Sequence, residues 1–358
     1  MSQQAPRSVD ETYATVDCDV HLTIPTDVVG RYLDDPYRTM LKGPSKYQPF
    51  ATSSWDQYMG ESISRRSTDD PDEVHETLAE LGIDYPVINN SAIFYRTSRA
   101  DVAANLMRGY NDAMLDVFLD EYDSFNGLIS VAPHEPTKAA EEIDRLGDES
   151  NVVGVYVPTS GPFDPLGNPE YDVVYRAAAD NDLPVVFHGS AEAFMLQFPR
   201  QNEGFNSFLE VHSMAHSWSQ MMTLTSLLVN GVPVKFPELE FVFLESGVGW
   251  VPYTTYRLNK EYSIRRQEAP LLERSPEEYV DESCYFSSQP LGEPNDAGDV
   301  GQLLELVGFD SLVFSSDYPH WDFDHLEELH KHLRSVCTDE ERKAVLSGNA
   351  SDVFDLGV

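Results

Sequence analysis

Eight short apolar segments of strand length alternate along this chain with longer segments of helical periodicity. Parallel strands that are covered on both faces appear as short, continuous apolar runs, and "PVVFH" and "SLVFSSD" have this form. Eight strand–helix units in succession predict an α/β fold of the (β/α)8 TIM-barrel class. The predicted strands are Tyr13–Leu22, Gly82–Asn89, Gly127–Ala132, Val152–Pro158, Pro184–His188, Glu240–Leu244, Ser283–Ser287 and Leu312–Ser315.

Helical periodicity fills the segments after these strands. The predicted helices are Pro71–Leu81, Arg99–Tyr122, Thr137–Leu146, Tyr171–Asn181, Ser207–Asn230, Trp250–Tyr262, Val300–Val307 and Asp324–Val336, with an extension at Asp339–Leu346. We expect Thr338 to cap that extension, since a Thr hydroxyl accepts from the first free backbone amides of a helix. An open doubly wound sheet is the alternative architecture. The first strand lacks the Gly-rich phosphate turn that a nucleotide-binding sheet of that kind carries.

One irregular stretch lies between the first strand and the first helix. Residues 23–70 are rich in Pro, Tyr and Ser, and the stretch is too long for an ordinary loop between a strand and a helix. On a barrel such an insertion lies over the C-terminal face, where substrates bind. We therefore predict a partial lid at 23–70 on a single domain that covers residues 1–358, because no repeat or interdomain linker is visible.

The chain is strongly acidic, with 24 Lys and Arg residues against 61 Asp and Glu residues and a formal net charge of −37. Such a surface repels phosphate backbones and anionic headgroups, which argues against binding to nucleic acid or to a membrane surface. Lys is scarce, and acidic residues occur in nearly every predicted helix. This pattern favours a halophilic protein over an ordinary acidic one, because high salt screens the self-repulsion of such a surface.

Three scattered cysteines, Cys18, Cys284 and Cys337, are too few for a disulfide framework or a Cys-based zinc site. The first ten residues are polar, and no apolar run approaches the length that spans a bilayer. The sequence therefore predicts a reduced, cytoplasmic protein.

Polar side chains occur at the carboxyl ends of four predicted strands. Asp19 and His21 are two apart in "VDCDVH", so both should face the barrel axis, while Cys18 and Val20 should face the helices. His188 ends the fifth strand and Asp317 follows the eighth. In a closed barrel these ends converge, and carboxylate and imidazole ligands together are typical of a divalent-metal site.

Each of these residues also has an ordinary structural explanation. A single His at a strand end is commonly a hydrogen-bonded core residue, and Asp317 before "YPHWD" has the form of a helix N-cap. Their joint placement at the ends of several strands favours the metal site. Glu245 adds a further acid at the end of the sixth strand, in "FVFLESG".

The sequence resembles the amidohydrolase superfamily, in the branch that groups aminocarboxymuconate-semialdehyde decarboxylase with resorcylate-type decarboxylases and related metal-dependent hydrolases. The resemblance covers nearly the whole chain. It rests on "DCDVHLTIP", "VVFHGS", "GVPVKFPELEFVFLESGVGWVPYTTYRL", "FSSDYPHWD" and "GNASDVFDL". It implies one divalent metal ion, zinc or manganese, held by Asp19, His21, His188 and Asp317.

Two departures from the pattern of that superfamily affect the chemistry. The first strand reads Asp-x-His instead of His-x-His, which makes the site harder and suits manganese. Glu245 occupies the place where the studied decarboxylases carry a catalytic His, so their mechanism does not transfer directly.

Further candidates flank the strand ends. His212 and His216 are four residues apart, on one side of a predicted helix, and either a solvated His pair or a general acid and base fits that pattern. His320 and Asp322 follow Asp317 and are placed to orient it, or to begin a helix. The cluster of His325, His330 and His332 is predicted to be a solvated helix face. Candidates for holding a substrate carboxylate are Arg200, Arg65 and Arg66.

The function that we predict is that of a metal-dependent hydrolase acting on a small carboxylated or aromatic substrate. A metal-bound water would attack a C–N, ester or activated C–C bond, with Asp317 as the general base, and Glu245, His212 or His216 would assist. Non-oxidative decarboxylation of an aromatic or unsaturated acid is the alternative, and an inactive metal-binding barrel is the third possibility. A homodimer or higher homo-oligomer is compatible with any of these.

Overall fold

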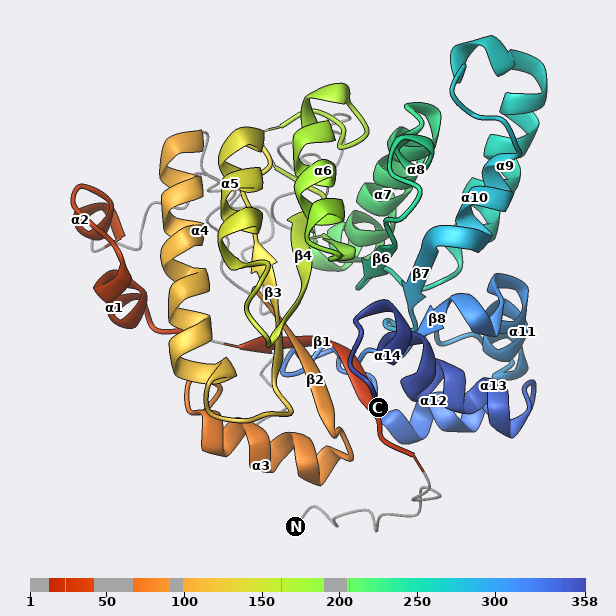
Figure 1. The fold of residues 1–358 in the computed structure, drawn as a ribbon. Helices are drawn as coiled ribbons and strands as arrows, with labels where there is room; N and C mark the ends of the chain where they lie inside the picture. Colours follow the sequence, from red (N-terminus) through yellow and green to blue (C-terminus); the bar gives the residue numbers. More distant parts are fainter. Residues whose placement is uncertain are drawn as a thin grey trace.

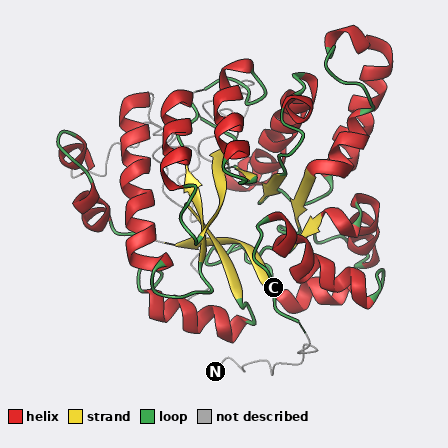
Figure 2. Cartoon of the chain, viewed as in Figure 1, coloured by secondary structure: helices red, strands yellow, loops and turns green. Residues whose placement is uncertain are grey.

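The central feature of the molecule is a sheet of eight parallel strands in the order β1 to β8 (Figures 1 and 2). The structure, a computed structural model, describes residues 13–22, 24–41, 67–90, 99–161, 163–189, 205 and 207–358. The strands are Val16–Leu22 (β1), Tyr85–Asn90 (β2), Asn126–Ser130 (β3), Val152–Pro158 (β4), Val185–His188 (β5), Phe241–Leu244 (β6), Cys284–Ser287 (β7) and Leu312–Val313 (β8).

The sheet closes between its first strand and the segment after its last. The Cys18 amide donates to the Phe314 carbonyl at 3.0 Å, and the His21 amide donates to the Tyr318 carbonyl at 2.7 Å. Val20 also forms a parallel bridge with Tyr318. These bonds confirm the TIM barrel predicted from the alternation of apolar runs.

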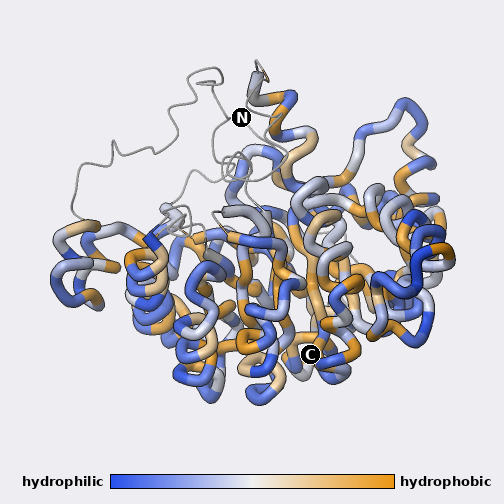
Figure 3. Tube along the Cα trace, turned by 90° about the horizontal axis from the view of Figure 1, so that it is seen from above, coloured by the Kyte–Doolittle hydropathy of each residue, from blue (hydrophilic) through white to orange (hydrophobic). Residues whose placement is uncertain are grey.

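Helices surround the barrel, as Figure 2 shows. The described helices are Thr26–Val29 (α1), Tyr37–Leu41 (α2), Pro71–Leu81 (α3), Ala100–Met114 (α4), Pro136–Leu146 (α5), Asp172–Asp180 (α6), Phe208–Val229 (α7), Val232–Lys235 (α8), Trp250–Arg265 (α9), Pro276–Ser283 (α10), Gly298–Val307 (α11), Leu326–Leu333 (α12), Asp339–Lys343 (α13) and Asn349–Val353 (α14). Hydrophobic and hydrophilic residues alternate along these helices in Figure 3, which is the pattern of helices that pack one face on a core.

Local signals fix several helix boundaries. The Asp70 side chain accepts from the amides of Asp72 and Glu73, and Gly82 ends α3 in the left-handed region at φ +83°. Thr338 caps α13 by accepting from the Glu341 amide, as the sequence predicts. The helix α10 was not predicted, although a capping box of Ser275 and Glu278 begins it.

The core has an inner and an outer part. The outer cluster packs the helices on the outward-facing strand residues, such as Phe187 and Phe243. The inner cluster unites inward-facing strand residues, among them Val186 and Val242, with Phe354 beside α14. Figure 1 shows α14 at the end of the barrel near the C-terminus, and the site described below lies where the strands end.

The described part of the insertion at 23–70 packs on the outside of the barrel. Both α1 and α2 contact α4, and the Tyr32 hydroxyl hydrogen-bonds the Asp116 carboxylate. Figure 1 shows both short helices beyond α4. Residues 23 and 42–66 lie outside the described residues, so the partial lid stays a prediction, as does the single domain over 1–358.

Candidate metal centre

Strand β1 brings Asp19 and His21 to the barrel mouth through an irregularity in its pairing. The register between β1 and β2 shifts between Asp17 and Val20. Because of this bulge, Cys18 packs in the inner cluster, whereas Val20 packs in the outer one. The expectation that Cys18 faces the helices is therefore wrong, since strict alternation does not hold across a bulge.

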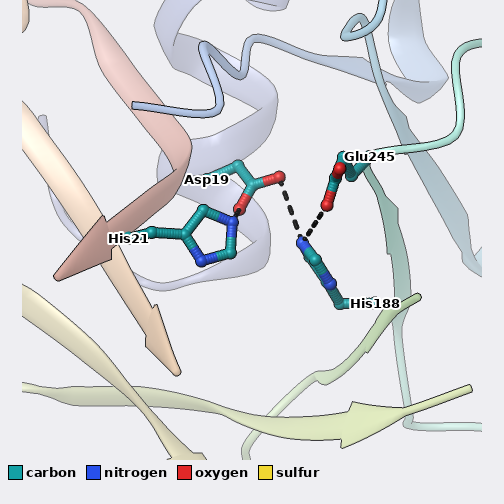
Figure 4. A group of neighbouring side chains, drawn as sticks. All are labelled: Asp19, His21, His188 and Glu245. Carbon is teal, nitrogen blue, oxygen red and sulfur yellow. Dashed lines mark ion pairs between the residues drawn. The ribbon is translucent and has the colours of Figure 1, made fainter. Parts of the chain in front are cut away.

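Four buried side chains at the carboxyl ends of β1, β5 and β6 meet over the barrel axis (Figure 4). The His21 Nε2 lies 3.2 Å from the Asp19 Oδ1, and the His188 Nε2 lies 3.6 Å from the Asp19 Oδ2. The His188 Nε2 also lies 2.9 Å from the Glu245 Oε2. One ligand atom from each of these residues lies within 4.8 Å of the others, a geometry that could hold a metal ion.

Asp317 lies beside this group and contacts it through His21. Its Oδ1 is 3.2 Å from the His21 Nε2 and 2.6 Å from the His320 Nδ1. Asp317 is fully buried, whereas the His320 side chain is 42 % exposed. The pair therefore links the buried group to solvent. His320 and Asp322 precede α12, which begins at Leu326, so neither is a first-turn helix residue.

The histidine pair of α7 reaches the same group from the other side of Glu245. The His216 Nε2 lies 3.3 Å from the Glu245 Oε1, and the His212 Nε2 lies 3.7 Å from the Asp322 Oδ2. The two rings are 5.1 Å apart, and His212 also lies against Trp321. His216 is buried, so this is not a solvated pair.

Other polar residues of the site escaped sequence reasoning. Asn89 of β2 donates to the Asp19 Oδ1, and the Gln289 Nε2 lies 3.5 Å from the Asp317 Oδ2. The Tyr156 hydroxyl lies 3.4 Å from the His188 Nδ1. Asn89 is the last residue of a predicted strand, so the search for polar residues at strand ends that identified His188 would also have identified it. Tyr156 lies within an apolar run and gave no such signal.

Burial and neighbouring charges shift the pKa values of the group in opposite directions. Burial favours neutral Asp19, but His188 and His21 outweigh it and lower the pKa of this carboxyl. Burial also opposes charge on Glu245, yet His216 and His188 lower its pKa. The pKa of Asp317 is instead raised well above its usual value by burial and by the negative charge of Glu245. Among the described residues, a dense set of buried carboxylates is thus faced by imidazoles.

The residues present fit a divalent cation. Although the Asp19 Oδ2, the His21 Nε2 and the His188 Nε2 lie at ion-pair distances from other site atoms, neither they nor the His21 Nδ1 form a hydrogen bond of normal geometry among the described residues. Buried polar atoms are nearly always satisfied, so these atoms need a further partner. Oxygen and imidazole donors that converge in this way suit zinc or manganese.

Other sequence-based predictions have different outcomes. Arg200, Arg65 and Arg66 lie outside the described residues. His330 is buried on α12, so the prediction of a solvated face is wrong for this member, while His325 is exposed. No helix in the described part of the chain has the length and apolar character needed to cross a bilayer. Cytoplasmic location, halophilic character and oligomeric state stay predictions.

Comparisons with known proteins agree with this architecture. The sequence profile of the family described as "Amidohydrolase" matches residues 16–356. The gamma-resorcylate decarboxylase of Polaromonas sp. (strain JS666 / ATCC BAA-500) is 22% identical over 302 residues, which cover 82% of this chain and 90% of that protein.

Solved structures show the same fold. An amidohydrolase from Mycobacterium avium subsp. paratuberculosis K-10 superposes with a TM-score of 0.73 at 18% identity, over 97% of this chain and 98% of that one. The dihydroxybenzoic acid decarboxylase of Polaromonas sp. JS666, with bound manganese and the inhibitor 2-nitroresorcinol, gives 0.70 at 16% identity over 97% and 98%. Two of these three proteins are named as decarboxylases. The comparisons thus favour decarboxylation, our alternative, and hydrolysis is not confirmed.

Proposed function

Because this chain belongs to the amidohydrolase family, we propose that it is a metal-dependent enzyme that removes carbon dioxide, without oxidation, from a small hydroxylated aromatic acid. The observation that carries the proposal is the meeting of four buried side chains, Asp19, His21, His188 and Glu245, over the barrel axis. Asp19, His21 and His188 each have a buried polar atom without a hydrogen bond among the described residues. The substrate class rests on the decarboxylases among the relatives, one of which holds an aromatic inhibitor.

The ligands that we propose for one divalent ion are Asp19, His21, His188 and Asp317, and we add Glu245 because it groups with the first three. We favour manganese, because carboxylate oxygens outnumber imidazoles in this set and a related structure holds manganese. When bound, the ion would act as a Lewis acid that holds the carboxylate and the adjacent hydroxyl of the substrate.

The residues of the chain would handle the proton. When the bond between the ring carbon and the carboxylate breaks, its electron pair stays on the ring carbon, which must then gain a proton. Asp317 is placed to donate it, and His320, in contact at 2.6 Å and partly exposed, is placed to return a proton from solvent. Glu245 and His216 would orient the ring, with His212 and Trp321 at the outer side of the site.

The test is a comparison of two substrate panels on protein loaded with Mn²⁺. We expect carbon dioxide release from 2,6-dihydroxybenzoate or related hydroxybenzoates, and no cleavage of acyl or amide compounds. Hydrolysis of the second panel without carbon dioxide from the first would overturn the proposal and restore the hydrolase interpretation.

Two variants test the proposed role of Asp317. Asp317→Asn should lose at least a hundredfold in kcat, since general acid–base catalysis contributes about that factor or more. His325→Ala, on an exposed residue at the start of α12, is the matched control and should keep normal rates. Full activity in an Asp317→Asn protein that still binds metal would show that another group moves the proton.

A further inference from the structure

The pair His212 and His216 forms, with Glu245, a second group of ligand atoms next to the first. One atom from each of the three lies within 4.8 Å of the others. We propose that this group binds a second divalent cation, and that the Glu245 carboxylate is shared between the two ions. The inference concerns metal binding and holds whether the enzyme decarboxylates or hydrolyses its substrate.

The helical spacing of the two histidines is the first reason. Residues four apart on a helix lie one above the other on the same face, and two histidines at this spacing are a recurrent ligand pair for zinc. Here the His216 Nε2 faces Glu245 and the His212 Nε2 faces Asp322, with the ring centroids 5.1 Å apart. Two histidines and one glutamate are a ligand set that catalytic zinc sites use, with the remaining position left for water or substrate.

The orientation of Glu245 is the second reason. Its two oxygens face different imidazoles, since Oε2 lies 2.9 Å from the His188 Nε2 and Oε1 lies 3.3 Å from the His216 Nε2. A carboxylate in this position can bind one ion through each oxygen. In two-metal enzymes the ions lie about 3.5–4 Å apart, a separation that a single carboxylate spans.

Charge is the third reason. Glu245 also groups with Asp317 and Asp322, and Asp19 lies on the far side of His188. Even with Asp317 protonated, the other three carboxylates of this largely buried region carry more negative charge than one divalent ion balances. Burying uncompensated charge is costly, and a second divalent ion would offset the negative charge that the first leaves.

The surroundings are those of an open site. His216 is buried, while the His212 side chain is 21% exposed, so one side of the group faces solvent. The Asp322 Oδ2, 3.7 Å from the His212 Nε2, is placed either to orient that ring or to bind the ion itself. A second ion in this group would therefore lie at its partly exposed side.

The experiment counts metal ions per chain. Chelator-treated protein is dialysed against Mn²⁺ and, separately, against Zn²⁺, and bound metal is measured by mass spectrometry. We expect two ions per chain for the unaltered protein, and one ion for His216→Ala and for His212→Ala. Met214→Ala is the matched control, because this residue lies between the two histidines on α7 but is 45% exposed, and it should keep two ions.

Three results would overturn the proposal. The first is one ion per chain in the unaltered protein, and the second is two ions in both His variants. The third is complete loss of metal from both His variants while circular dichroism shows that they are folded. His212→Ala guards against a failure of His216→Ala to fold, since its side chain is less buried. The number of bound ions and the release of carbon dioxide are measured independently. A protein with two ions could lack decarboxylase activity, and a protein with one ion could have it, so each proposal can fail without the other.

Discussion

Gln220 links the helix that carries the histidine pair to the two strands that carry His188 and Glu245. It lies one turn beyond His216 on α7 and is fully buried. Its Nε2 donates to the Phe187 carbonyl at 2.9 Å and to the Leu244 carbonyl at 3.1 Å. Each carbonyl belongs to the residue just before a site residue. We therefore expect Gln220→Met to weaken both the fold and the site.

The magnitude follows from the two hydrogen bonds. Each buried neutral bond contributes about 1 kcal/mol net, so the loss of both costs about 2 kcal/mol in the free energy of unfolding. Met has nearly the same length and removes the Gln220 Oε1, which has no partner among the described residues. That removal is favourable, so the net loss should be about 1–2 kcal/mol.

Urea denaturation of metal-saturated protein, followed by tryptophan fluorescence, measures this loss as a shift in the midpoint at constant slope. Ser213→Ala is the matched control on the same helix, because Ser213 is exposed and its hydroxyl, as far as the described residues show, donates only to the Leu209 carbonyl within α7. It should change stability by less than about 0.5 kcal/mol. Equal effects of the two substitutions would refute the argument that Gln220 anchors α7 to the strands.

Three further predictions concern pH, metal and salt. Burial and the charges of Arg334 and Arg342 lower the pKa of His330 to about 4, so the folded protein favours the neutral ring. The contribution of this ring to the free energy of unfolding is therefore fully present above pH ~6.5 and is lost as the pH falls towards 4. When the pH is lowered from 7.5 to 5, the free energy of unfolding should fall less in His330→Leu than in the unaltered protein. An equal fall in both would contradict the prediction. Chelation should abolish activity and lower the melting temperature, and Mn²⁺ at a hundred times its Kd should restore about 2.7 kcal/mol; unchanged melting would argue against a metal centre. Because the net charge is −37, raising KCl from 0.1 to 2 M should raise the melting temperature, and a decrease would exclude the halophilic interpretation.

The sequence predicts the barrel well because each parallel strand is covered on both faces and must be apolar. The bounds of β4 and α3 match the prediction residue for residue, and β5 ends at His188 as expected. Strand ends of a barrel converge, so the candidate residues of the site could be chosen before any distance was known.

Tertiary contacts explain what could not be predicted. The burial of His330 depends on the packing of α12, which its own segment does not encode. The bulge in β1 arises from pairing with β2, so alternation misplaced Cys18. The position of Glu245 between two imidazoles depends on α7 crossing the ends of β5 and β6, and only the fold brings those segments together.

Backbone conformation adds an argument about which carboxylates the site requires. Glu245 and Asp317 adopt left-handed conformations, with φ at +48° and +63°, where glycine would be less strained. Asp182 and Asp355 also have positive φ, but both are exposed, where a short polar residue tolerates such a turn. A buried carboxylate at such a position costs free energy through its desolvation and through the left-handed backbone, and a glycine would avoid both costs. Strain of this kind is commonly found at functional sites, and here each buried carboxylate lies among site histidines, Glu245 near His188 and His216 and Asp317 near His21 and His320. The strain thus supports, from backbone geometry alone, the roles proposed for Glu245 and Asp317.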